Sequence, residues 1–153
     1  MVHVFPILSL LCLPLALAAS DADDPQWCNQ FRGPERNGVY RSTGLLARWP
    51  KDGPPLLWER QGMGAGYSSP VVTPDGIFVT GDETGELVIT ALAVDGTPRW
   101  RKPNGKAWAK SYPGARATCT YHRGRLYHMN GHGRLACLDA KTGAEIWAVP
   151  LLE

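Results

Sequence analysis

The sequence lacks a strong charge imbalance, and beyond its first residues it lacks any helical pattern. Its 153 residues include 16 Lys and Arg against 14 Asp and Glu, a net charge of +2, and these charges are scattered. No basic stripe is therefore available to bind nucleic acid or an anionic lipid surface. After residue 20 no stretch repeats its apolar residues with a helical period, so helices are not expected there.

Recognisable catalytic motifs are also missing. The chain has no nucleophile elbow, no phosphate loop and no metal-ligand spacing. His122, His128 and His132 are the candidates for a metal site, but the first two are expected on opposite faces of a hairpin and the third in the next turn, without a carboxylate pair beside them. We therefore assign no catalytic, cofactor-binding or metal-binding residue.

Residues 1–20 contain no Lys, Arg, Asp or Glu. The run from Val4 to Leu17 is almost entirely apolar and too short to span a bilayer, and it leads into Ala16-Leu17-Ala18, a small-x-small pattern of the kind that signal peptidase cleaves. No Lys or Arg precedes the run, where only the amino terminus and His3 could carry charge, and this leaves an uncleaved anchor as the alternative. The sequence predicts a cleaved signal peptide, and with it a chain exported to the periplasm or beyond and without a membrane span.

Tryptophan recurs along the rest of the chain. Trp58, Trp100 and Trp147 each close a β-like segment, at intervals of 42 and 47 residues. A repeat of about this length is typical of propeller blades. The two aligned copies each contain four short runs rich in Val, Ile, Tyr, Phe and Thr, separated by turn dipeptides such as Asp75-Gly76 and Arg123-Gly124. The pattern predicts two consecutive antiparallel sheets in which Trp100 and Trp147 hold equivalent places.

Two segments resemble a known family. Residues 139–147, Asp-Ala-Lys-Thr-Gly-Ala-Glu-Ile-Trp, resemble the tryptophan-docking signature of the pyrroloquinoline-quinone-like (PQQ-like) β-propeller repeat family. Residues 30–50, which begin Gln-Phe-Arg-Gly-Pro, resemble the N-terminal arm of its secreted bacterial members. In the first copy, Ala93 replaces the signature Asp and the turn is one residue shorter. The resemblance implies an all-β, partial β-propeller of about two four-stranded blades plus a closing strand, the N-terminal fragment of a longer ring.

The expected organisation follows from this resemblance. It comprises a signal peptide at 1–20, an N-terminal arm at 21–53 and a partial propeller at 54–153, with a closing strand at 54–60 and blades at 66–103 and 114–153. In the family, such an N-terminal strand commonly completes the last blade of the ring. The structural signature residues are Trp58, Gly96, Trp100, Asp139, Thr142, Gly143 and Trp147. They are expected to shape turns and to pack one blade on the next, without contacting a ligand.

Three cysteines remain after signal removal, Cys28, Cys119 and Cys137. If Arg123-Gly124 and Gly131-His132 are two-residue turns, the last two cysteines lie two strands apart, about 9 to 10 Å sideways, beyond the ~7 Å between Cα atoms that a disulfide allows. Both are expected to be buried free thiols. The same register places His128 opposite Leu135.

Two functional classes remain open. The first is a non-catalytic extracytoplasmic propeller, a binding or assembly scaffold without a cofactor, whose loops face a protein, polysaccharide or small ligand that the sequence does not identify. The second, also implied by the resemblance, is the start of a quinoprotein dehydrogenase that uses PQQ and calcium. The first is favoured, because quinoprotein alcohol dehydrogenases carry an adjacent Cys-Cys pair and this sequence has none.

The candidate binding surface is the interblade loop at residues 104–113. It combines two lysines with two aromatic residues at one end of the expected propeller, and these candidates are Lys106, Trp108, Lys110 and Tyr112. Loops at that end of a propeller commonly carry function. The sequence nevertheless favours the other interpretation, a solvated connector whose Trp108 covers the edge of a blade.

Overall fold

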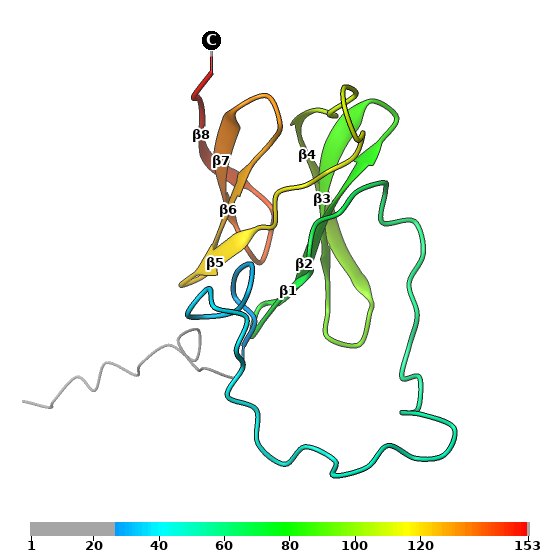
Figure 1. Ribbon diagram of the computed structural model, residues 1–153. Coiled ribbons are helices and arrows are strands. Elements are labelled where there is room, and N and C mark those ends of the chain that lie inside the picture. Colours follow the sequence, from blue (N-terminus) through cyan, green and yellow to red (C-terminus); the bar gives the residue numbers. More distant parts are fainter. Residues whose placement is uncertain (1–26, 153) are drawn as a thin grey trace, which may run out of the picture.

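The structure, a computed structural model, describes residues 27–152 and consists of two four-stranded antiparallel sheets (Figure 1). The first contains, in spatial order, β1 (Val71–Thr73), β2 (Gly76–Glu83), β3 (Glu86–Leu92) and β4 (Pro98–Lys106). The second contains β5 (Thr120–His122), β6 (Arg125–Met129), β7 (Arg134–Asp139) and β8 (Glu145–Pro150). Between residues 27 and 152 no helix has the length and apolar character to cross a membrane. The fold is all-β, a partial propeller; the predicted signal peptide lies outside the described residues.

The two sheets repeat each other residue by residue. Cross-strand pairing joins Val71, Phe78, Ala91 and Trp100 in the first sheet, and Thr120, Tyr127, Cys137 and Trp147 in the second. Both rows therefore end in a tryptophan on the outermost strand. Each indole also packs on the aromatic ring of its row, with 5.8 Å between the ring centroids of Phe78 and Trp100 and 6.1 Å between those of Tyr127 and Trp147. The prediction that the two tryptophans hold equivalent places is confirmed.

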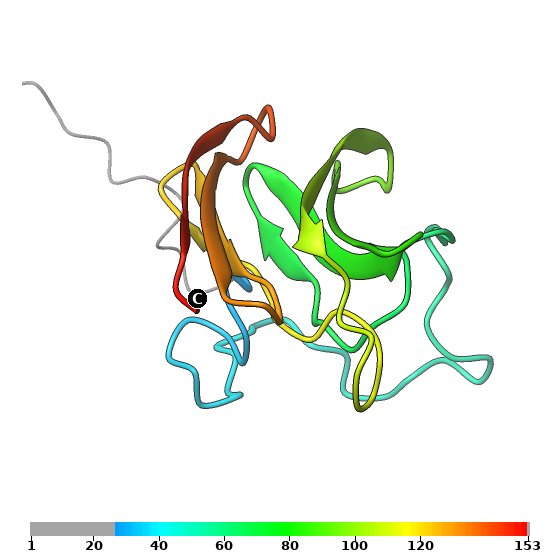
Figure 2. The same cartoon turned by 90° about the horizontal axis from the view of Figure 1, so that it is seen from above.

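The core lies between the facing surfaces of the two sheets, as the view from above shows (Figure 2). Phe78 and Ile89 from the first sheet and Leu126 from the second are fully buried, and each such side chain contributes about 1.5–3 kcal/mol. The Phe78 ring stacks 6.3 Å from the ring of Tyr121. Thr80 Oγ1 donates a hydrogen bond of 2.9 Å to the Ala117 carbonyl. The inward-facing residues of neighbouring blades thus form one continuous core.

The opposite face of the second sheet is uncovered by any of the described residues. Met129, Trp147 and Val149 are 46%, 41% and 40% exposed there. The described part of the chain therefore leaves an apolar blade face open.

The N-terminal arm is anchored to the first strand of each sheet. The Cys28 carbonyl accepts the Val72 amide of β1 at 2.9 Å, and the Asn29 carbonyl accepts the Tyr121 amide of β5 at 2.8 Å. The arm thereby covers two edge strands that would otherwise present unpaired backbone groups.

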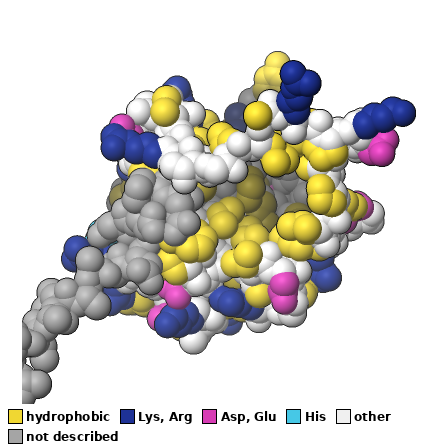
Figure 3. Space-filling view, turned by 90° about the horizontal axis from the view of Figure 1, so that it is seen from below, with side chains coloured by type: hydrophobic (Ala, Val, Ile, Leu, Met, Phe, Trp, Pro, Cys, Tyr) yellow, Lys and Arg dark blue, Asp and Glu magenta, His cyan; other side chains and the backbone are white. Residues whose placement is uncertain are grey.

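Seen from below, hydrophobic side chains gather in the hollowed centre of the molecule, with charged side chains around the rim (Figure 3).

Trp58 and Trp100 dock in the same way on successive blades. Trp58 Nε1 donates to the Val94 carbonyl and Trp100 Nε1 to the Ala140 carbonyl, each at 3.0 Å. Each indole also lies against a glycine of the same turn. A Cβ on Gly96 would stand 2.8 Å from the Trp58 ring, and one on Gly143 would stand 2.6 Å from the Trp100 ring. Both glycines have positive φ, +84° and +69°, a region that favours glycine.

The turn between β7 and β8 is organised by Asp139. Its Oδ1 accepts the Lys141 and Thr142 amides at 3.1 and 2.8 Å and the Thr142 hydroxyl at 2.9 Å. The bonds from Thr142 are the main cause that lowers the pKa of Asp139 below its ordinary value. In the shorter turn of the first sheet, where Ala93 stands in place of Asp, Asp95 Oδ1 instead accepts the Thr97 amide at 2.9 Å. The expected turn bonding of Asp139 and Thr142 is confirmed.

The predicted register of the second hairpin is wrong by one residue. The Arg123-Gly124 turn is as expected, and His122 lies opposite Arg125. The next turn contains four residues, 130–133, because Asn130 Oδ1 accepts the amides of both His132 and Arg134 at 2.9 Å. His128 consequently lies opposite Ala136 instead of Leu135. Cys119 and Cys137 are nevertheless buried and unbonded, as predicted.

Residues 54–60 are not a strand. Their backbone is irregular and pairs with no strand of the described chain. A closing strand acquires its β structure from the blade that it completes, and that partner is not among the described residues. The closing-strand interpretation therefore stays a prediction, supported by the docking of Trp58.

Candidate functional site: a pocket between the two sheets

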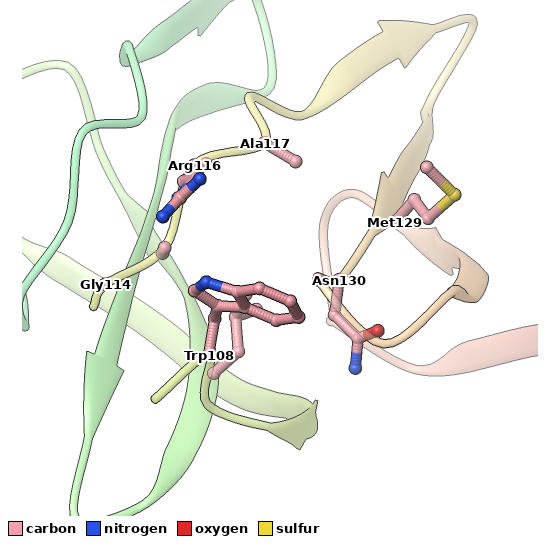
Figure 4. A pocket seen from close by; sticks show the side chains of 9 residues that line it. Trp108, Gly114, Arg116, Ala117, Met129 and Asn130 are labelled. Atoms are coloured by element: carbon pink, nitrogen blue, oxygen red, sulfur yellow. The ribbon is translucent and has the colours of Figure 1, made fainter. Parts of the chain in front are cut away.

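A pocket of about 360 Å³ opens between the two sheets at the end opposite the arm. Leu87 contributes from β3, Trp108, Arg116 and Ala117 from the connector between the sheets, and Met129 and Asn130 from the end of β6 and the turn after it. In the close view (Figure 4) the Trp108 indole forms the floor, with Arg116 on one side, Ala117 above, and the end of β6 on the other side, where the Met129 side chain points away from the indole. The volume lies within the range typical of ligand pockets, about 300–1,000 Å³.

The connector that supplies Trp108 is fixed by hydrogen bonds to β2 and to itself. The Trp108 amide donates to Asp82 Oδ2 at 3.1 Å, and its indole Nε1 donates to the Ser111 carbonyl at 3.0 Å. The Gly114 amide closes the loop on the Trp108 carbonyl at 3.2 Å. These bonds hold the indole in one orientation beside the second sheet.

Trp108 also contacts the second sheet directly. A Cβ on Gly131 would lie 3.0 Å from the indole, and the His132 ring centroid lies 5.6 Å away. Two cations flank the indole: Lys110 Nζ and the Arg116 guanidinium lie 5.7 and 5.8 Å from the ring centroid. Both distances are within the ~6 Å range of cation–π attraction. The pocket therefore combines an aromatic floor with positive charge.

A buried polar network forms the wall behind Asn130. Asn130 Nδ2 donates to the Asn104 carbonyl at 2.8 Å, and Asn104 Nδ2 contacts His128 Nδ1 at 2.9 Å. Arg134 donates to Asn104 Oδ1. Because Arg134 can only donate, this contact fixes the orientation of the Asn104 amide, so its Nδ2 faces His128. Imidazole Nδ1 is then an acceptor, and the proton of neutral His128 sits on Nε2.

His128 is neutral at neutral pH. Its side chain is 2% exposed, and burial lowers its pKa to about 4, an effect that the backbone carbonyl of Ala117 only partly opposes. Its Nε2 makes no hydrogen bond of normal geometry. Asp82 shows the opposite response, because burial raises the pKa of its carboxyl group while the Trp108 amide and His132 act to lower it.

The structure brings together only part of the predicted loop surface. Trp108 lines the pocket and Lys110 lies beside its ring. Lys106 is instead the last residue of β4, opposite Glu86, because the outer strand continues further than expected. Tyr112 is 77% exposed and is not among the lining residues, although its carbonyl accepts a bond from Arg116 at 2.6 Å. In the described part of the chain, no three His, Cys, Asp or Glu side chains gather where they could hold a metal ion.

Sequence reasoning missed the residues that the second sheet contributes. Met129 and Asn130 precede a predicted turn, and Arg116 lies just past the predicted loop surface. Met129 and Asn130 come close to Trp108 only because one sheet packs on the other, whereas Arg116 belongs to the same connector as Trp108. The available signal was the position of the Asn130-Gly131 turn, which in a propeller lies at the same end as the connector that follows the preceding blade.

The informative comparison with known proteins is a family match in the second half of the chain. Among curated proteins no match was found. A solved structure of a europium-containing methanol dehydrogenase aligns with 57% of this chain and 17% of its own, at 17% identity and a TM-score of 0.44. The chain thus spans a small part of that enzyme's length, and a likeness at this level carries no argument about activity. Residues 85–153 match the family described as outer membrane protein assembly factor BamB, and this match, together with the repeated tryptophan rows, supports PQQ-like β-propeller repeats in this part of the chain.

Proposed function

We propose that this chain is part of a non-catalytic, exported propeller that binds another macromolecule at the loop end of its blades. The observation that carries the proposal is the Trp108 pocket, a preformed and largely apolar recess between two blades. The matched family is named for an assembly factor of outer membrane proteins, which supports a scaffold role outside the cytoplasm. The apolar segment Val4 to Leu17 supports export.

The chemistry of the recess also supports binding over catalysis. Two histidines adjoin its lining. His128 is sealed from solvent and engaged by Asn104 through Nδ1, and His132 beside Trp108 has its Nε2 on the Ala107 carbonyl at 3.1 Å. A general base must be within hydrogen-bond reach of the proton that it removes. His128 cannot meet that condition for a ligand in the pocket.

The first test separates this proposal from the quinoprotein dehydrogenase alternative. The full chain is titrated with PQQ in the presence of calcium, followed by absorbance, and assayed for dye-linked oxidation of alcohols. The proposal expects neither saturable binding nor activity. Stoichiometric PQQ binding by this chain would overturn it.

The second test locates the binding face. The photocrosslinking residue p-benzoylphenylalanine is introduced at Tyr112, which is exposed at the loop end, or at Val94, which is 54% exposed in the turn at the opposite end. After irradiation in secreting cells, adducts with an exported macromolecule are expected from Tyr112 and not from Val94. Adducts mainly from Val94 would place the binding face at the wrong end for this proposal.

A further inference from the structure

The geometry points to the kind of ligand that the pocket takes. We propose that it accepts an apolar side chain of a partner polypeptide, together with a neighbouring acidic residue held by Lys110 and Arg116. This inference rests on the proposed function, because it specifies the chemistry of the same binding face.

The walls of the pocket are suited to an apolar side chain. Leu87, which is 2% exposed, and Ala115, which is 1% exposed, both line the pocket. Ala117, above the Trp108 indole (Figure 4), adds a further methyl group. A Phe or Leu side chain above the Trp108 indole would remove both surfaces from water, which is the main favourable term in such association.

The polar groups of the pocket are already engaged within the protein, which argues against a sugar. Asn130 uses Nδ2 on the Asn104 carbonyl and Oδ1 on two amides. Trp108 Nε1 is held by the Ser111 carbonyl. A carbohydrate needs several partners for its hydroxyl groups, and each hydroxyl left unpaired on burial lowers affinity. The observations therefore favour a polypeptide over a polysaccharide.

The charges at the pocket favour an acidic segment. Lys110 and Arg116 both flank the Trp108 ring, and none of the residues lining the pocket carries a carboxylate. Arg116 Nη2 is bound to backbone carbonyls of the connector, which fixes the guanidinium while its other N–H groups can donate to a ligand. Because these cations are exposed, each ion pair should strengthen binding by only about two- to fivefold. The apolar side chain would supply affinity and the carboxylate selectivity.

The test uses capped pentapeptides and the full chain. The reference probe is Gly-Asp-Phe-Asp-Gly; the matched probes replace both Asp by Asn, both Asp by Lys, or Phe by Ala, and an oligogalacturonate represents acidic polysaccharides. Affinity is measured by NMR titration of the Trp108 indole N–H and the Leu87 methyl groups. The Asp-Phe-Asp peptide should bind best, and replacing Phe by Ala should weaken binding at least tenfold.

Three variants locate the effect. Ala117→Leu fills the pocket and should weaken the reference peptide at least tenfold. Arg116→Gln should reduce the preference for Asp over Asn by about two- to fivefold. Lys51→Gln removes one exposed positive charge in the arm and should change neither. Circular dichroism confirms that each variant is folded.

Several results would overturn the inference. They are equal affinity for the Asp and Lys peptides, equal affinity for the Phe and Ala peptides, unchanged binding in Ala117→Leu, or tighter binding of oligogalacturonate than of any peptide. If none of the peptides binds while crosslinking from Tyr112 still succeeds, the ligand chemistry is wrong and the binding face stands. If the chain binds PQQ, the proposed function itself fails.

Discussion

Removing the indole of Trp100 tests whether tryptophan docking holds the two blades together. The ring packs on Phe78 and on Gly143, and its Nε1 donates to the Ala140 carbonyl. Large-to-small aromatic replacements in cores cost about 3–5 kcal/mol, and about 1 kcal/mol of this is the hydrogen bond. Since Trp100 is only half-buried, Trp100→Ala should lower the free energy of unfolding by about 3 kcal/mol. Trp100→Phe keeps a ring and should lose about 1 kcal/mol.

The matched control is Trp147→Ala. Trp147 has the same place in its sheet, but it is 41% exposed and its only described ring contact is Tyr127. An aromatic pair of this kind contributes about 1 kcal/mol. Urea unfolding of the full chain, followed by circular dichroism, measures all three variants. Equal losses for Trp100→Ala and Trp147→Ala would refute the docking argument. In a longer ring in which a further blade covered Trp147, Trp147→Ala would instead cost about 3–5 kcal/mol.

Three further outcomes follow from buried or strained groups. The pKa of His128 falls from 6.5 to about 4 on folding, so between these pH values the unfolded chain binds more protons than the folded chain. The contribution of this imidazole to the free energy of unfolding should be constant above pH 6.5 and should fall by about 3 kcal/mol as the pH drops to 4. A flat profile in urea unfolding would contradict its burial. Burial raises the pKa of the Cys119 thiol to about 12, so iodoacetamide at neutral pH should alkylate half-buried Cys28 first, and mass spectrometry showing Cys119 modified first would contradict the fold. Gly143→Ala places a Cβ against the Trp100 ring at a φ of +69°, and it should destabilise the chain by more than the control Gly85→Ala. At Gly85 φ is +87°, but the added Cβ meets nothing within 4 Å. Equal melting temperatures for the two variants would show that the clash is relieved.

The sequence predicted the repeat because one row of side chains is visible in it. Trp100 and Trp147 recur at nearly the same distance from the turns that precede them, and alternation in the strands between them sets the period. The register between β6 and β7 was not predictable in this way. It depends on the side chain of Asn130, which binds two backbone amides and enlarges the turn to four residues. Local pattern shows where a turn occurs but not how a side chain closes it.

The pocket was predictable only in part, for a different reason. Trp108 and Lys110 are neighbours in the sequence, and their aromatic and basic character already marked the connector as a candidate surface. Met129 joins them from the other blade, and no spacing within the sequence encodes that contact. Lys106 was assigned to the loop because polar residues at the end of β4 resemble a connector. It stays in the strand through its pairing with Glu86, beyond a break in the regular register.

Trp58 provides the last structural argument about the ring. Trp100 stands on the outermost strand of the first sheet and docks on the turn of the second. Trp58 makes the same two contacts, a carbonyl and a glycine, with the corresponding turn of the first sheet. A residue that docks like an outermost tryptophan occupies the place of an outermost strand in the blade before β1. Residues 54–60 thus lie where the outermost strand of a preceding blade would lie, and this is the physical basis for proposing them as a closing strand.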